Sequence, residues 1–273
     1  MAKYDIRPLQ MRMLKILLAF DKVCKEENLR YCIMNGTMLG AIRHKGFIPW
    51  DDDMDVGMPR PDYERFIAGC ADWLPKPYEF VCPENDPEYP LPFGKLQDSS
   101  TTLIERKHLS YLGGIYVDVF PIDAVPNNFF ARHWHFTKYE FFKQALYFVH
   151  RDPYRHGHGP SCWLPLLVRK MFSMTELQHS IRKLLTKYDY DKSWKIADYT
   201  EGLWGVRDKT IYGEYAEYLF EGEKVTGIKL YDKYLKLTYG DYRKLPDKEH
   251  QRQHNFYYMD LNKPYWQFYN ESL

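Results

Sequence analysis

Four aspartates near residue 50 carry the clearest chemical signal in the sequence. Asp51, Asp52, Asp53 and Asp55 place four negative charges within five positions. A β-strand projects residues i and i+2 from one face, so a strand here would present Asp53 and Asp55 together, with the apolar residues turned into a core. Two adjacent carboxylates are costly unless a cation lies between them. The pattern therefore predicts a divalent metal site of the kind used with substrate phosphates, the alternative being a solvated acidic loop.

A short apolar segment precedes these aspartates. Residues 31–34 are expected to form a strand that leads into a turn at Gly36 and Thr37 and then into a short helix. Small residues at such a turn let the backbone approach a ligand, and the N-terminus of the helix is suited to bind a phosphate. Glycine at such a corner is also ordinary turn chemistry. The turn is stronger evidence for a phosphate site because an Asp-hydrophobic-Asp segment follows the short helix.

A glycine turn followed by two aspartates on the next strand resembles the nucleotidyltransferase superfamily. The longer segment 35–55 resembles the signature of the LicD family of phosphocholine transferases, to which the fukutin-type proteins are related. Three later segments extend the resemblance: 93–98, 114–123, and 239–246 with His254 beyond it. Four ordered motifs make the resemblance specific, and they cover both ends of the chain.

This resemblance implies an α+β fold, with a nucleotidyltransferase-like mixed β-sheet core flanked by helices and a helical insertion. It also implies metal-dependent transfer of phosphocholine from CDP-choline to a sugar hydroxyl, with release of CMP. The acceptor would be a cell-surface glycan or a teichoic-acid precursor, free or attached to a lipid. The implied cofactor is Mg²⁺, for which Mn²⁺ could substitute.

The resemblance also implies roles for the carboxylates. Asp53 and Asp55 would bind the metal ion, and Asp118 would share the metal or take the proton from the acceptor hydroxyl. Asp51 would be a ligand of a second metal if the strand begins early enough to include it. Asp98 would orient a lysine of its own strand or bind metal.

The remaining predicted site residues would contact the nucleotide donor. Gly36 and Thr37 would hold the phosphates, and Lys95 would make a further phosphate contact. Arg43 would neutralise the leaving group, with surface solvation as the alternative. Trp50 would stack on a base or on choline, since aromatic rings bind quaternary ammonium groups, or would simply anchor the start of the strand.

Two other functions stay open on the sequence. One is a nucleotidyltransferase that adds a nucleoside monophosphate to a small molecule or protein, because the motif does not fix which phosphorus is attacked. The other is a non-catalytic glycan-binding or nucleotide-binding protein with a decayed site. The presence of all three superfamily carboxylates, Asp53, Asp55 and Asp118, argues against decay.

Charge and cysteine content exclude several classes of protein. The chain has 273 residues, with 38 Lys and Arg against 37 Asp and Glu, so bulk charge does not favour nucleic-acid binding. Five scattered cysteines form no C-x-x-C pair, which indicates neither a zinc site nor a disulfide framework. The N-terminus lacks an apolar leader and no long apolar window occurs, so a cytoplasmic location is expected.

We expect one LicD-like domain over residues 1–273. Within it, residues 1–126 would form the catalytic core, 127–198 a helical insertion, and 199–273 a part that returns to the core. The insertion begins with an aromatic-rich helix at 129–150. Such a helix is usually a core element, and the alternative is peripheral contact with the inner face of a membrane near a lipid-linked acceptor.

Overall fold

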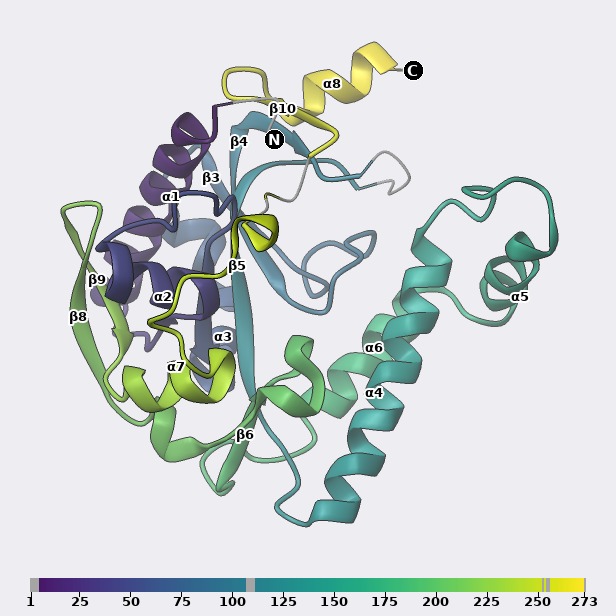
Figure 1. The fold of residues 1–273 in the computed structure, drawn as a ribbon. Coiled ribbons are helices and arrows are strands. Elements are labelled where there is room, and N and C mark those ends of the chain that lie inside the picture. Colours follow the sequence, from purple (N-terminus) through teal and green to yellow (C-terminus); the bar gives the residue numbers. More distant parts are fainter. Residues whose placement is uncertain (1–4, 107–110, 252, 254–255, 273) are drawn as a thin grey trace.

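The computed structural model describes residues 5–106, 111–251, 253 and 256–272 (Figure 1). The α-helices are α1 (Arg7–Glu26), α2 (Asn35–His44), α3 (Arg60–Trp73), α4 (Phe129–His150), α5 (Trp163–Met171), α6 (Met174–Leu185), α7 (Tyr231–Tyr239) and α8 (Tyr265–Ser272). The strands are β1 (Cys32–Ile33), β2 (Asp55–Pro59), β3 (Tyr78–Val81), β4 (Gly94–Ile104), β5 (Gly113–Ala124), β6 (Lys195–Asp198), β7 (Val206–Asp208), β8 (Tyr215–Phe220), β9 (Glu223–Ile228) and β10 (Tyr258–Asp260).

The strands form one mixed sheet at the centre of the molecule. Its main order is β10-β4-β5-β2-β1-β9-β8, while β3 pairs with β4, and β6 pairs with β5 and β7. Strands β2 and β5 are parallel, as are β1 and β9, whereas β4 and β5 are antiparallel. This arrangement confirms the expected α+β class with a mixed sheet.

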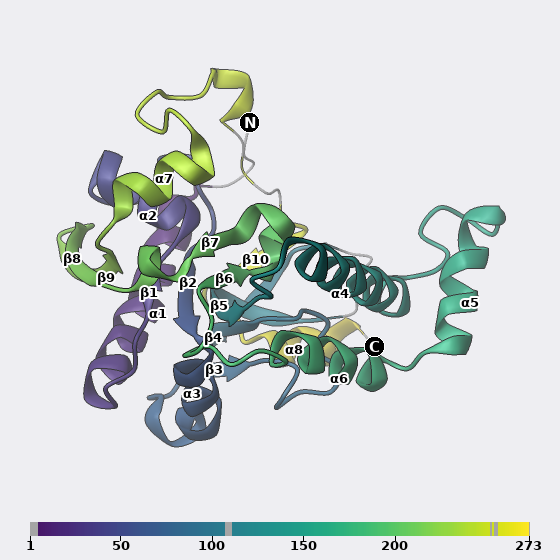
Figure 2. The same cartoon turned by 90° about the horizontal axis from the view of Figure 1, so that it is seen from below.

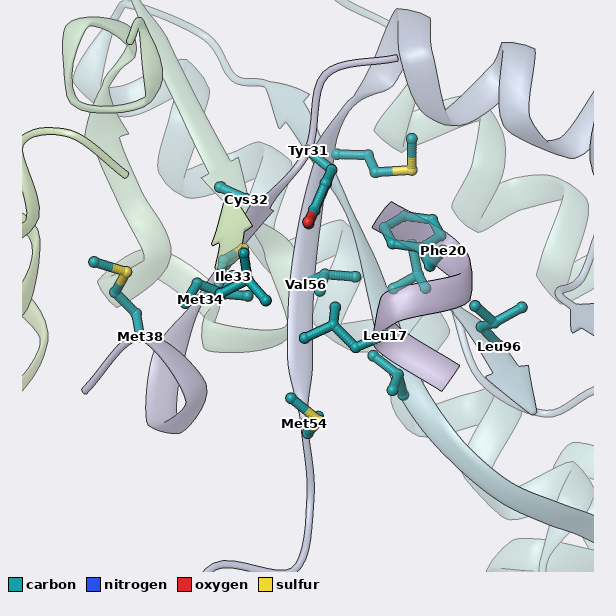
Figure 3. Close-up of a cluster of buried hydrophobic side chains, with 14 of the residues drawn as sticks. Leu17, Phe20, Tyr31, Cys32, Ile33, Met34, Met38, Met54, Val56 and Leu96 are labelled. Carbon is teal, nitrogen blue, oxygen red and sulfur yellow. The ribbon is translucent and has the colours of Figure 1, made fainter. Parts of the chain in front are cut away.

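Helix α1 covers one face of this sheet, as its apolar periodicity predicts. Leu9, Leu17 and Phe20 are completely buried. Figure 3 shows Leu17 and Phe20 gathered with Met54 and Val56, which lie at the start of β2. Each buried side chain of this size contributes about 1.5–3 kcal/mol to folding. This packing fixes the strand that carries the carboxylates.

Helices α4, α5 and α6 form an arm beside the sheet. Helices α4 and α6 run side by side away from the strands, and α5 lies at their far end (Figures 1 and 2). The arm has its own hydrophobic core, which includes Phe136, Leu146, Leu177 and Ile181. Strand β6 follows the arm and returns the chain to β5 through antiparallel pairs such as Ile122 with Asp198.

Three expected boundaries differ from the structure. Strand β2 begins at Asp55 rather than at Asp53, so the preceding aspartates lie in an irregular segment. Helix α2 begins at Asn35, which places Gly36 and Thr37 in its first turn rather than in a turn before it. Residues 93–97 and 101–105, which the sequence pattern predicts as two separate strands, fall mostly within the single strand β4, which has a register shift in its middle.

The C-terminal third of the chain completes the sheet beside the N-terminal elements. Strand β9 pairs with β1, and α7 packs against α2. His254, part of the C-terminal motif, lies outside the described residues. In the part of the chain that the structure describes, no helix combines the length and apolar character needed to cross a membrane.

Candidate active site

The predicted carboxylates come from two neighbouring parallel strands. Asp55 of β2 is the register partner of Asp118 of β5. Partners on adjacent strands project to the same face, so the two side chains are neighbours. Met54 and Val56 are fully buried, which turns Asp53 and Asp55 toward the opposite side, as the alternation predicts. The amide of Asp118 also donates to the carbonyl of Met54 at 2.8 Å, which extends the hydrogen bonding between the two segments to Met54.

Burial and mutual repulsion raise the pKa values of the paired carboxylates in this cluster. Burial raises the pKa of Asp55 well above its ordinary value, and the charges of Asp53 and Asp118 raise it further, while a hydrogen bond from Asn35 opposes the shift. Burial also raises the pKa of Asp118 to about 7, against the opposing charge of Lys95. These carboxylates share one low-dielectric site, so an added positive charge would stabilise their ionised forms.

One oxygen of Asp118 is available to a ligand. Its Oδ1 is buried and has no hydrogen-bond partner among the described residues, and the nearest cation, Lys95 Nζ, lies 3.6 Å away. Oxygen ligands of this kind suit Mg²⁺ or Mn²⁺. Within the same described ranges, no three Asp, Glu, His or Cys side chains stand close enough together to hold one ion as they are. The metal set therefore remains a prediction.

Lys95 is held by a polar cluster that the sequence did not reveal. Its ammonium group donates to Glu105 and lies 3.2 Å from the centre of the Tyr116 ring. The hydroxyl of Tyr116 donates to the same oxygen of Glu105 at 2.7 Å. Burial favours the neutral form of Glu105, but the charge and hydrogen bond of Lys95 outweigh it and lower the pKa of Glu105 to about 2. Lys95 is thus fixed between two carboxylates.

An irregularity in β4 brings Glu105 to this position. The register with β5 shifts between Asp98 and Leu103, and the amide of Ile115 donates to the side chain of Thr101 in the shifted segment. A Cβ on Gly114 would lie 2.0 Å from the carbonyl oxygen of Asp98, so only glycine allows this close approach. Bulges of this kind commonly redirect side chains near functional sites.

The expectation that Asp98 orients Lys95 or binds metal is wrong. The two residues are three positions apart on one strand, so their side chains leave from opposite faces. Asp98 is fully buried and forms an ion pair with Arg12 of α1 at 2.9 Å. It therefore ties α1 to the sheet and takes no part in the carboxylate cluster.

The first turn of α2 borders the carboxylates. A Cβ on Gly36 would lie 2.7 Å from Asp51 Oδ2, so the absence of a side chain makes room for that carboxylate. The hydroxyl oxygen of Thr37 accepts a hydrogen bond from the amide of Asp55 at 2.8 Å and holds the start of β2. The N-cap residue, Met34, provides no side-chain cap, and Tyr234 accepts from the Asn35 amide alone, so the following amides of the first turn are suited to an anion.

Asp51 reaches the cluster from an irregular segment that lies against the first turn of α2, rather than from the strand. It precedes β2 in an irregular segment, so the expected shared strand face with Asp53 does not exist. Its charge nevertheless contributes to the raised pKa of Asp55. A position against Gly36 keeps Asp51 at the edge of the site.

One cavity is lined by residues of the carboxylate cluster, and a second lies beside α2. One, of about 210 Å³, is lined by Asp53, Asp118, Lys95, Glu105 and Tyr116, among others. The other, of about 430 Å³, is lined mainly by α2 and the C-terminal motif: Leu39, Arg43, Ile48, Trp50, Tyr239, Asp241, Tyr242, Lys244, Leu245, Pro246, Asp247 and His250. The sequence motif of residues 239–246 thus forms a wall of this second cavity.

Arg43 and Trp50 lie at this second cavity. The guanidinium of Arg43 donates to the carbonyl of Tyr242 at 3.2 Å, and burial lowers the pKa of Arg43. Trp50 is half-buried and packs against the main core. Tyr239 connects the two regions, because burial and then the charges of Asp55 and Asp51 raise its pKa.

A contact between α2 and α7 was also missed by sequence reasoning. The Tyr234 hydroxyl donates to Asn35 Oδ1 at 2.8 Å and accepts from the Asn35 amide at 3.0 Å. Since Asn35 also bonds to Asp55, this tyrosine supports the carboxylates from the C-terminal part of the chain. No local pattern could have identified it, because the two residues are 199 positions apart.

A family model matches the segment that carries the carboxylate cluster. Residues 28–154 match the model described as LicD/FKTN/FKRP, nucleotidyltransferase domain. The matched range contains Asp53, Asp55, Asp118 and Lys95. This chain carries a LicD family domain. The site lies within that domain, and the second cavity adds residues from outside it.

Three relatives of this LicD domain protein differ in how much they match. The lipopolysaccharide cholinephosphotransferase LicD of Haemophilus influenzae is 28% identical over 263 residues, which covers 93% of this chain and 97% of that protein. An uncharacterized protein of Rickettsia typhi is 49% identical over 41 residues, 15% of this chain and 13% of its own. One of Rickettsia prowazekii is 51% identical over 37 residues, 14% of each. The family domain and the nearly full-length match make the chain a transferase.

Proposed function

We propose that this chain transfers phosphocholine from CDP-choline to a hydroxyl of a cell-surface glycan, such as lipopolysaccharide or a teichoic-acid precursor. CMP would be the second product. The Haemophilus influenzae relative, named as a lipopolysaccharide cholinephosphotransferase, supports the transferred group and the acceptor class. Within the chain, the proposal rests on one observation: Asp55 and Asp118 are register partners on parallel strands, with Lys95 beside them.

The reaction is proposed to need Mg²⁺, with Mn²⁺ as a substitute. Asp53, Asp55 and Asp118 would hold the ion, and Asp51 would serve a second one. The mutually raised proton affinities and the unbonded Asp118 Oδ1 fit a hard divalent cation. A bound ion would neutralise the diphosphate oxygens, which is the main electrostatic requirement of phosphoryl transfer.

The side chains and backbone would position the donor. The uncapped start of α2 at Gly36 and Thr37 suits phosphate oxygens, and Lys95 supplies a further donor. Trp50 and Tyr239 offer aromatic faces for the base or for the quaternary ammonium of choline. Arg43, in the same cavity, would balance negative charge on the departing CMP.

The transfer step balances without another reactant. The acceptor hydroxyl oxygen forms a bond to the phosphorus that bears choline, and the bond from that phosphorus to the bridging oxygen breaks. CMP leaves with the electron pair of the broken bond. Asp118 is proposed either to accept the hydroxyl proton or to serve as a metal ligand, and its raised pKa of about 7 suits a base near neutral pH.

A direct assay tests this function. Purified protein is incubated with CDP-choline, Mg²⁺ and a lipopolysaccharide or teichoic-acid acceptor, and CMP is measured by chromatography. We expect CMP release that depends on both acceptor and metal. Absence of CMP with every acceptor tried, from folded protein, would contradict the proposal.

A second candidate is transfer of a nucleoside monophosphate, which the family description as a nucleotidyltransferase domain favours. Mass spectrometry of the modified acceptor separates the two reactions. Added phosphocholine supports the first proposal, whereas an added nucleotide supports the second.

A further inference from the structure

We propose that the arm docks on an anionic lipid bilayer through a surface formed by Phe130, Trp134, Phe141, Trp163 and Leu167. We call these residues the arm surface. They belong to α4 and α5, outside the carboxylate cluster, its cavity and the cavity beside α2. The inference does not depend on which group the enzyme transfers.

Helix α4 carries two apolar stripes. One includes Phe136 and Leu146 and is buried in the core of the arm. The other consists of Phe130, Trp134 and Phe141, whose spacing of four and seven residues puts them on one helical face. These three side chains are 79%, 62% and 56% exposed. A core needs only the first stripe, and a contiguous exposed apolar face marks an interaction site.

Helix α5 adds a second exposed apolar surface at the end of the arm (Figures 1 and 2). Among its residues only Pro165 is buried. Trp163 is 68% exposed, and Leu164, Leu167 and Met171 are also exposed. A helix of nine residues is marginal on its own, so its apolar face needs a partner environment.

Polar and aromatic contacts connect α5 to the end of α4. The guanidinium of Arg169 donates to the carbonyls of Val149 and Arg151, at 3.0 and 2.8 Å. The rings of Phe141 and Phe172 lie 6.3 Å apart and join the two apolar surfaces. The hydrogen bonds from Arg169 hold α5 at the end of α4, while the apolar side chains of α5 remain exposed.

Lysines surround a groove in the same region. The groove, of about 660 Å³, lies between α4 and α6 and includes Trp134 and Phe141 in its lining. Lys138, Lys183 and Lys187 line it as well, all three exposed. None of the three forms an ion pair with any residue that the structure describes.

The charges near the arm surface favour an anionic bilayer over a second copy of this chain as its binding partner. Exposed Trp, Phe and Leu beside unpaired lysines are the composition of helices that lie in the headgroup region of anionic membranes. A second copy of this chain would set these lysines against the same lysines if the contact were two-fold, and like charges would oppose it. Docking would hold the transferase at a membrane surface.

Vesicle sedimentation tests the proposal with the full chain. Vesicles of phosphatidylglycerol and phosphatidylethanolamine are compared with vesicles of phosphatidylcholine alone. We expect wild-type protein to bind the anionic vesicles, and added salt to weaken the binding. The double variants Trp163→Ser/Leu167→Ser and Lys183→Glu/Lys187→Glu should each weaken it by about tenfold or more.

Matched controls separate the arm from general surface effects. Trp266→Ser changes a tryptophan that is 53% exposed on α8, and Lys15→Glu/Lys22→Glu makes the same charge change on α1. Both should bind vesicles like wild type, and all variants should keep the wild-type unfolding temperature. Three results would overturn the proposal: no vesicle binding by wild type, arm variants that bind normally, or a solution dimer that only the arm variants break.

Discussion

At the scale of single residues, the site is a balance between buried negative charge and one fixed cation. Asp55 and Asp118 face each other across β2 and β5, and burial raises the pKa of each above its ordinary value. Lys95 only partly offsets this, because it also bonds to Glu105. Such residues work against stability, which is typical of groups kept for catalysis.

Replacing either paired aspartate should separate activity from stability. Asp55→Asn and Asp118→Asn should each lower the transfer rate by at least about two orders of magnitude, given what metal ions supply to such reactions. The free energy of unfolding should stay equal or rise at pH 8, because a buried like charge is removed. CMP release and urea unfolding measure the two effects. Asp72→Asn, at an exposed position of α3, is the control, and near-normal activity in either site variant would refute the assignment.

The aspartates could be located from sequence because period-two alternation and motif order both point to them. Glu105 could not, because its position depends on the irregular middle of β4. Tyr234 was also missed, since it meets Asn35 only in the folded chain. Asp98 was misassigned because sequence proximity to Lys95 suggested a contact that strand geometry forbids.

At the scale of elements, a buried ion pair joins α3 to β5. Arg60, in the first turn of α3, makes two hydrogen bonds of 2.6 Å to the carboxylate of Asp123. Both side chains are almost fully buried. This bidentate pair fixes the end of the strand that carries Asp118.

Breaking this pair should destabilise the protein strongly. Asp123→Ala removes the buried partner of Arg60 and leaves its charge with only the half-buried Glu64, so the free energy of unfolding should fall by about 3–5 kcal/mol. Lys229→Ala breaks the exposed Lys229–Glu214 ion pair. It should change the free energy of unfolding by less than about 1 kcal/mol. Urea denaturation compares them, and equal losses in the two variants would disprove the role given to the buried pair.

Asp198, at the end of β6, should make stability depend on pH. Burial raises its pKa to about 6, although hydrogen bonds from Thr200 oppose the shift. Between pH 4 and 6, near its unfolded and folded pKa values, the folded state binds more protons. This carboxyl therefore lowers the free energy of unfolding as pH rises through that window, by at most about 3 kcal/mol.

The variant Asp198→Asn tests this, because asparagine cannot ionise but keeps an oxygen for the Thr200 bonds. Its free energy of unfolding should fall less than that of wild type between pH 4 and 7. Asp191→Asn, an exposed position, should follow wild type. If the free energy of unfolding changes with pH equally in wild type and Asp198→Asn, the carboxyl does not titrate in this range.

Element types were largely predictable, whereas exact strand limits were not. Helices α1 and α4 were predictable because their apolar periodicity spans many residues. Strand β2 starts late because hydrogen bonding to its neighbours, rather than residue type, decides where a strand begins. The merging of two expected strands into β4 likewise depends on pairing with β5 and β10.

At the scale of the whole molecule, two hydrophobic cores of unequal size support the sheet and the arm. The sequence marked the aromatic helix at 129–150 as a core element or as a membrane-contact helix. The buried stripe of α4 is the core element. Its exposed stripe motivates the docking proposal. The packing of α6 and of Tyr199 decides which face of α4 is covered, so the pattern alone could not separate the two roles.

The two cores should open independently. In native-state hydrogen exchange, amides of α4, α5 and α6 should exchange through openings of lower free energy than amides of β2 and β5. The reason is that the arm core contains fewer buried side chains than the core of the sheet. Mass spectrometry of peptides from both regions measures this. A single shared opening energy would contradict it.

The link between Asn35 and Tyr234 has a consequence for synthesis on the ribosome. The two residues are separated by 199 positions, so at 5–20 residues per second the tyrosine is made about 10–40 s after the asparagine. During that interval β1 also lacks β9, its parallel neighbour. The carboxylate cluster thus leaves the exit tunnel long before the residues that support it from the C-terminal part of the chain, with an open strand edge that chaperones would have to shield from aggregation.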